Sequence, residues 1–166
     1  MTPQTFIQRI LDPSLWIASE LIAIPLSAEA RLELMAIAGQ ESSWAERLQI
    51  DAPQYGRSFW QFEQGGINAL ATNATTGPKL DALLDALAIP MVLPQVHVAC
   101  AWCDPLAVGM ARLLLYADPH PLPAIGDQDG AWQTYLRCWN PGKPRPDDWP
   151  FNYQTAVTTC GGSRPA

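Results

Sequence analysis

The sequence has few charged residues and no surplus of basic ones. Only 16% of the residues are charged, and sixteen acids against ten Lys and Arg residues give a net charge of −6. Such a chain lacks the cations that neutralise phosphates, so nucleic acid is not an expected partner. Because 48% of the residues are hydrophobic, there is enough apolar surface for a buried core, and disorder is not expected.

Long apolar runs are also missing. No run approaches the length of a membrane span, and the opening residues, MTPQTFIQRILDPSLW, do not place a long apolar stretch after a basic one. We therefore expect no membrane span and synthesis in a cytoplasm without a signal peptide. The four cysteines are then expected to be reduced, buried thiols: Cys100, Cys103, Cys138 and Cys160.

Alternating strand-like stretches, internal repeats and domain linkers are nearly absent. Sixteen prolines and eleven glycines instead separate short segments with helical periodicity. This pattern predicts an all-α single domain over residues 1–166, mainly helical with at most a small irregular hairpin. Within it we expect N-terminal helices over 1–26, a core over 27–146, and a C-terminal tail over 147–166 that packs on the core.

Caps and prolines mark where the helices begin. Helices are predicted to begin at Asp12-Pro13, Ser27, Gly65-Gly66, Gly77-Pro78, Pro94 and Asp104-Pro105, with a later one ending before Asn140 and a short one from Phe151 to Cys160. The segment from Asp104 to Asp118 is apolar nearly all round, which predicts that it is the central buried helix.

The helix that Ser27 caps carries an acid on its apolar side. Its core-facing stripe ends in Glu41, whereas the side expected to face solvent carries Glu29, Arg31 and Glu33. Burial and the negative end of the helix dipole both disfavour the charged form, so a raised pKa is expected for the Glu41 carboxyl. A carboxyl that stays protonated suits a general acid. The alternative is that Glu41 turns to solvent or pairs with a nearby arginine.

Three short motifs follow one another along the chain. QESSW contains Glu41-Ser42, GRSFWQFEQGG contains Ser58-Phe59-Trp60-Gln61, and YLRCWNPGKP contains Trp139-Asn140. In this order they resemble the lysozyme-like superfamily of goose-type lysozymes and lytic transglycosylases, and in particular its small phage and prophage members. The resemblance covers roughly residues 32–146.

The resemblance implies a lysozyme-like fold and cleavage of the β-1,4 bond between N-acetylmuramic acid and N-acetylglucosamine in peptidoglycan. Glu41 would protonate the leaving oxygen and, in a lytic transglycosylase, would then act as the base. The implied substrate-binding residues are Ser42, Ser58, Trp60, Gln61, Trp139 and Asn140. The expected partner is a peptidoglycan glycan strand.

A muramidase that inverts needs a second carboxylate to activate water. Glu63 and Asp51 are the candidates for this role. Glu63 more simply caps the following helix or pairs with Arg57, and Asp51 more simply lies in a turn.

Three positions depart from the family pattern. Ser58 stands where the family has Gly, Trp60 where it often has Met, and Trp139 where it often has Tyr. These departures keep open a catalytically inactive phage structural or glycan-binding protein, and a chitin-directed enzyme remains a further alternative. The leading interpretation is a monomeric phage-encoded endolysin, made in the host cytoplasm, that acts at the bacterial cell wall after release or from a virion.

A zinc site can also be drawn from the sequence. Cys100 and Cys103 have a permitted spacing, with His97 and Cys138 as further donors. Both cysteines lie in an apolar helical context without a second paired motif, so buried thiols are expected instead, and neither a metal nor another cofactor is expected.

Overall fold

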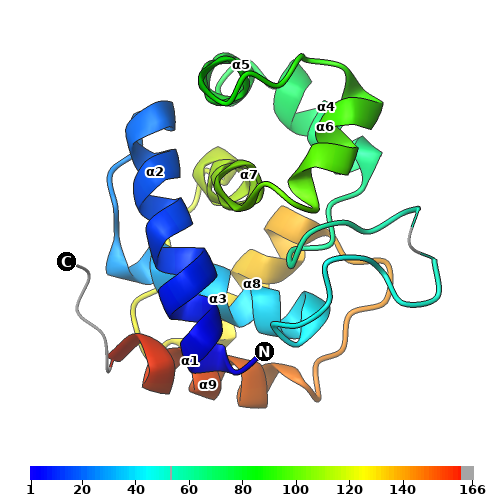
Figure 1. Ribbon diagram of the computed structural model, residues 1–166. Coiled ribbons are helices and arrows are strands. Elements are labelled where there is room, and N and C mark those ends of the chain that lie inside the picture. Colours follow the sequence, from blue (N-terminus) through cyan, green and yellow to red (C-terminus); the bar gives the residue numbers. More distant parts are fainter. Residues whose placement is uncertain (53, 162–166) are drawn as a thin grey trace.

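The computed structural model describes residues 1–52 and 54–161, and this part of the chain is mostly helical, with no β-strand (Figure 1). The elements are α1 (Pro3–Phe6), a π-helical turn η1 (Ile7–Leu11), α2 (Asp12–Ile22), α3 (Ala28–Ser42), α4 (Gln64–Thr72), α5 (Gly77–Ala86), α6 (Leu93–Cys100), α7 (Asp104–Ala117), α8 (Gln128–Trp139) and α9 (Trp149–Gly161). The predicted all-α class is confirmed. Among the described residues, no single helix is long and apolar enough to cross a membrane.

Helix α7 occupies the centre of the molecule, as predicted for the segment that is apolar all round. Figure 1 shows it between α5 above and α3 and α8 below, and it packs against α2, α4 and α6 as well. All residues from Leu106 to Leu113 are buried. A helix with neighbours on all sides has no place for a solvated stripe, which is why its sequence has almost none.

Helix α3 is buried to the same extent, and here the expectation of a solvated side is wrong. Ser27 caps the helix as predicted, because its hydroxyl accepts a hydrogen bond from the Ala30 amide at 3.0 Å. Arg31 and Glu33, however, are 5% and 0% exposed. The reason is that η1, α7, α8 and α9 all pack against α3, which leaves it no side toward water.

The two buried charges on α3 have different surroundings. Arg31 forms an ion pair with Asp12 at 2.6 Å and donates to the Cys160 carbonyl at 3.0 Å. Within residues 1–52 and 54–161, Glu33 has no hydrogen-bond partner at either carboxyl oxygen. Asp12 therefore stabilises a buried arginine, and it does not cap a helix: the chain is already helical from Pro3 through η1 into α2.

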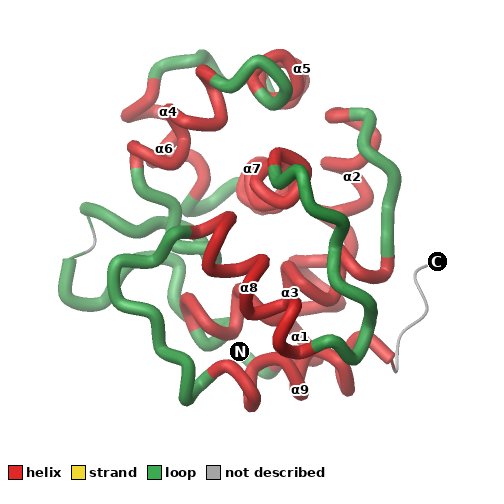
Figure 2. The backbone as a smooth tube through the Cα atoms, turned by 180° about the vertical axis from the view of Figure 1, so that it is seen from behind, coloured by secondary structure: helices red, strands yellow, loops and turns green. Residues whose placement is uncertain are grey.

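The two ends of the described chain lie together. α1 packs against α9, and Figure 1 shows both helices along the same edge of the molecule. On another side, two long loops run past each other: residues 43–63 between α3 and α4, and residues 140–148 between α8 and α9 (Figure 2). These loops border the C-terminal ends of α3 and α8.

Candidate functional site

A cleft of about 740 Å³ opens where the two long loops meet the ends of α3 and α8. Its lining comes from α3, α4, α7 and α8 and from both loops, so distant parts of the chain build it together. The lining includes six of the residues predicted from the sequence: Glu41, Trp60, Gln61, Glu63, Trp139 and Asn140. The volume lies in the range typical of ligand sites, about 300–1,000 Å³.

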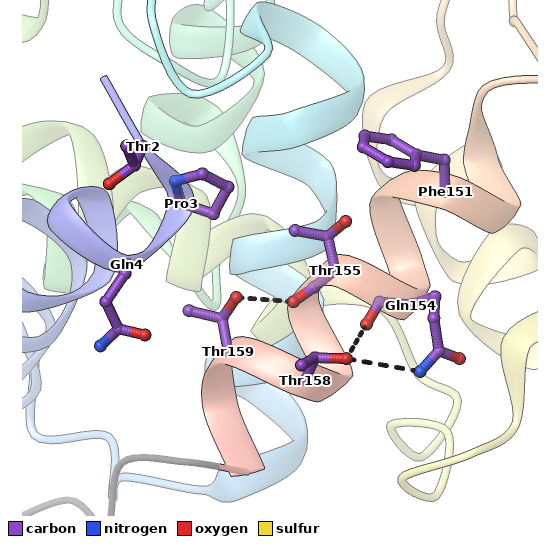
Figure 3. A pocket seen from close by; sticks show the side chains of 8 residues that line it. All are labelled: Thr2, Pro3, Gln4, Phe151, Gln154, Thr155, Thr158 and Thr159. Atoms are coloured by element: carbon purple, nitrogen blue, oxygen red, sulfur yellow. Dashed lines mark hydrogen bonds between the residues drawn. The ribbon is translucent and has the colours of Figure 1, made fainter.

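A second, shallower depression of about 420 Å³ lies between α1 and α9 (Figure 3). Figure 3 shows Thr155, Thr158 and Thr159 on α9, with Thr2 and Gln4 on the opposite wall. No side chain that lines it is an acid, a base or a thiol. Of these two hollows, the cleft is therefore the one with candidates for general acid–base chemistry.

Glu41 lies in the last turn of α3, and the end of this helix is firmly held. Trp44 folds back under the turn, buried, and its indole Nε1 donates to the Met35 carbonyl at 2.9 Å. Gly39 makes room for this ring, since a Cβ at that position would collide with Trp44. Ser43 closes the helix in the left-handed conformation at φ 52°. The carboxyl of Glu41 is thus carried by a backbone that has little freedom.

The buried amide of Gln40 joins the end of α3 to two other parts of the chain. Its Nε2 donates to the Arg145 carbonyl at 2.9 Å, and its Oε1 accepts from Asn152 Nδ2 at 2.9 Å. The guanidinium of Arg145 donates in turn to the Gln40 carbonyl. A cation at the C-terminal carbonyls of a helix is favoured by the helix dipole.

The electrostatics of Glu41 follow from this position. Burial raises the pKa of its carboxyl, whereas the hydrogen bond from Tyr135 and the charge of Arg145 lower it, and the net effect is a raised pKa. The Tyr135 hydroxyl donates to Glu41 Oε1 at 2.6 Å. Glu41 faces the cleft with a protonatable oxygen, and it neither turns away to open solvent nor forms an ion pair within the described residues.

Tyr135 is the main site residue that the sequence analysis missed. It stacks on Trp149 with ring centroids 5.5 Å apart, and Trp132 packs beside both rings. Burial, followed by the adjacent Glu41, strongly raises the pKa of the Tyr135 hydroxyl, which therefore remains a donor. A signal for it exists in the sequence: Tyr135 lies four residues before Trp139, and residues with this spacing share a helix face.

Replacing Tyr135 by Phe is expected to raise the pKa of Glu41 further. The hydrogen bond from the hydroxyl favours the ionised carboxylate, so its loss leaves desolvation less opposed. The pKa can be measured from the carboxyl ¹³C shift of Glu41 as the pH is varied. Tyr153→Phe is the matched control, because the Tyr153 hydroxyl contacts the Gly126 amide and not Glu41. An unchanged or lowered pKa in Tyr135→Phe would contradict the assigned role.

The second motif forms a tight turn in a small irregular hairpin. Isolated bridges join Arg57 to Leu48 and to Phe62. Within the turn, Ser58 has φ 65° and Gln61 has φ 50°. Left-handed backbone at Ser58 favours glycine, which gives a physical reason for the glycine that the resembled family has at this position. Gln61 Nε2 donates to the Ser58 carbonyl at 2.9 Å and so holds the turn closed.

Trp60 does not occupy the place predicted for it. Its side chain is 0% exposed, packs near Phe6 and Phe59, and donates from Nε1 to the Leu34 carbonyl at 3.0 Å. A ring with no exposed face has none to offer to a sugar. Trp60 reaches the cleft through its backbone, where its carbonyl accepts from Trp139 Nε1 at 3.1 Å.

The third motif contributes to the wall formed by the end of α8. The Trp139 ring is half-buried beside the cleft, and its hydrogen bond to Trp60 ties the end of α8 to the hairpin. Asn140 is exposed and ends α8 in the left-handed conformation at φ 44°, which asparagine tolerates better than most residues. The chain then turns along the cleft.

Three predicted residues lie outside the cleft lining. Ser42 is buried and donates from Oγ to the Ala38 carbonyl of its own helix at 2.8 Å. Ser58 is fully buried in its turn, and Asp51 is exposed on the loop. Ser42 and Ser58 are thus structural residues, and Asp51 does not line the cleft that contains Glu41.

Glu63 is the second carboxylate of the cleft. It occupies the N-cap position of α4, but its side chain does not cap the helix, and within the described residues it forms no ion pair with Arg57. Neither of the simpler roles expected for it is therefore seen. Its exposed carboxylate is available to the cleft.

No known protein-family model, curated protein or solved structure matches the chain. The resemblance to the lysozyme-like superfamily therefore depends on the three motifs. What the structure adds is that Glu41, Gln61, Trp139 and Asn140, at least one from each motif, line one cleft.

The four cysteines are free thiols in the described structure, but only Cys100 is buried as expected, and Cys103, Cys138 and Cys160 are half-buried. Burial raises the pKa of Cys100 and of Cys138 to about 12, so both are protonated thiols near neutral pH. His97 Nε2 lies 2.7 Å from the Tyr55 carbonyl and 2.9 Å from the Phe62 carbonyl, which requires a proton on that nitrogen. Within the described part of the chain, no three His, Cys, Asp or Glu side chains are grouped as a metal site requires.

Proposed function

We propose that this chain cleaves the β-1,4 bond between N-acetylmuramic acid and N-acetylglucosamine of peptidoglycan, with Glu41 as the general acid. The observation that carries the proposal is the position of Glu41: a carboxyl with a raised pKa, held on a fixed helix end, at the wall of an open cleft. A proton donor of this kind suits the protonation of a glycosidic oxygen.

The surrounding residues support a bound sugar chain. Trp139 adds a half-buried amphipathic aromatic ring, and Gln61 and Asn140 add polar residues to the lining of the cleft. Such a mixture of aromatic and polar groups is common in sites for small polar ligands. This activity would suit a phage lysin that acts at a bacterial cell wall.

After the leaving oxygen is protonated, two routes are open. Glu41, now ionised, accepts the proton of the muramoyl 6-hydroxyl, whose oxygen attacks the anomeric carbon and closes a 1,6-anhydro ring. Alternatively a second carboxylate activates water, and Glu63 is the other acid that lines the cleft. Glu41 alone suffices for the first route, so we propose the lytic transglycosylase reaction as the leading form.

Mass spectrometry of the soluble products from purified peptidoglycan tests the proposal. Glycan fragments are expected with the protein and not in a protein-free incubation. A muramic end lighter by one water identifies the transglycosylase reaction, and a full reducing end identifies hydrolysis. A folded protein that binds the strands and releases no fragments would instead be a glycan-binding module.

A further inference from the structure

Both positively and negatively charged side chains belong to the cleft lining. Elsewhere Arg31, Arg47 and Arg137 are bound to aspartates at 2.5–2.9 Å. The cations among the residues that line the cleft are Lys143 and Arg145. The acids of the lining are Glu41, whose pKa is raised, and Glu63.

The two cleft cations differ in their partners. Arg145 is paired with Asp148 at 2.8 Å and bound to the Gln40 carbonyl. Lys143 is exposed and, within the described part of the chain, donates no hydrogen bond and forms no ion pair. Its ammonium group is therefore free to meet a ligand, whereas the Arg145 guanidinium is already used to hold the loop.

The segment that carries Lys143 is held at both ends. On one side, Trp139 donates to the Trp60 carbonyl at 3.1 Å, and on the other, Gln40 donates to the Arg145 carbonyl at 2.9 Å. Between these anchors, Pro141 and Gly142 line the cleft together with Lys143. The lysine is thus set at a defined place along the cleft, with a flexible side chain on a tethered backbone.

We propose that Lys143 forms an anion subsite that binds the carboxylates of a muramoyl strand. These carboxylates belong to the lactyl group or to the stem peptide attached to it. The inference rests on the function proposed above and deepens it by naming what separates peptidoglycan from chitin. Chitin is a neutral polymer of N-acetylglucosamine and offers no group for a free ammonium. A point charge such as Lys suits a carboxylate whose position varies between free and peptide-linked forms.

Kinetics on two matched substrates test this subsite. The substrates are native peptidoglycan strands and the same strands with their carboxyl groups amidated by methylamine. With Lys143→Gln we expect KM on native strands to rise about two- to fivefold, the effect of one exposed charge pair, with kcat unchanged. On amidated strands wild type and variant should have equal KM. Lys143→Arg should restore the native value.

The controls separate the possible failures. Lys79→Gln removes the other lysine, which lies outside the cleft lining and donates to the Ile22 carbonyl at 2.7 Å, and it should leave KM unchanged. Added salt should raise the wild-type KM on native strands more than that of Lys143→Gln. Cleavage of both substrates with equal KM by wild type and Lys143→Gln would overturn the subsite and leave the enzyme intact. Cleavage of neither substrate by the folded wild-type protein would overturn the proposed function and the subsite with it.

Discussion

Glu41→Gln is expected to lower the rate of peptidoglycan cleavage by about a hundredfold to ten-thousandfold, the usual contribution of a general acid–base group. The amide has the same shape but cannot give up a proton to the glycosidic oxygen. It can still accept the hydrogen bond from the Tyr135 hydroxyl. The cleft should therefore keep its geometry, and the binding of glycan strands should persist while fragments are released far more slowly.

The pH dependence gives a second measurement on the same variant. The raised pKa means that the wild-type carboxyl carries its proton to a higher pH than an ordinary glutamate. Activity is then retained at lower pH and lost as the pH rises through that pKa. This loss should be absent from the residual activity of Glu41→Gln.

Glu20→Gln is the matched control for this experiment. Glu20 is exposed on α2 and does not line the cleft, so its loss should change neither rate nor pH profile. Cleavage by Glu41→Gln at the wild-type rate would remove Glu41 from the mechanism.

Glu33→Leu is expected to stabilise the protein at neutral and higher pH, by on the order of 1–3 kcal/mol for the removal of a buried polar group without a partner. Neither carboxyl oxygen of Glu33 has a hydrogen bond, and the side chain is fully buried in α3. Leucine has a similar size and matches the apolar neighbours of that helix.

The stability change has a defined pH dependence. Burial raises the pKa of Glu33 well above its ordinary value, and the nearby Arg137 opposes this only in part. Tyr153 and Cys138 also lie within electrostatic range of Glu33, and both are neutral near pH 7. The folded chain thus holds a proton that the unfolded chain has released, so the free energy of unfolding falls as the pH rises from the ordinary glutamate range to the raised pKa.

Urea denaturation at several pH values checks both statements. Glu33→Gln, which is neutral at all pH, should match the wild type below the ordinary pKa of a glutamate and exceed it increasingly above. Parallel stability curves for wild type and Glu33→Gln would show that Glu33 is ionised in the folded state.

The helices were predictable because local signals mark them. Ser27 caps α3 by the expected hydrogen bond, and α5 and α7 begin at their expected prolines. The same local signals did not predict that α3 is buried on all sides. Arg31 was expected to face water, as a charged residue in a helix usually does. Instead it is buried and binds Asp12 and the Cys160 carbonyl, which are distant from it in the sequence.

The sequence motifs predicted residues that line the cleft, but they could not predict which side chains packing would bury in the core. Glu41 lines the cleft, whereas Trp60 lies in the core, where Phe6 of α1 and Phe59 pack near its ring. Lys143 lies in a proline-rich loop without periodicity, so no pattern could assign it a direction. Only the two anchors on either side of it reveal which way it faces.

The contact between α1 and α9 has a practical consequence for engineering. Neither helix lines the cleft, so both ends of the described chain leave the molecule away from Glu41. A cell-wall-targeting module fused at either end would leave the entrance to the cleft open. A circular permutant that joins the two ends through a short linker, with new ends in the exposed loop after α7, should likewise retain the helical core.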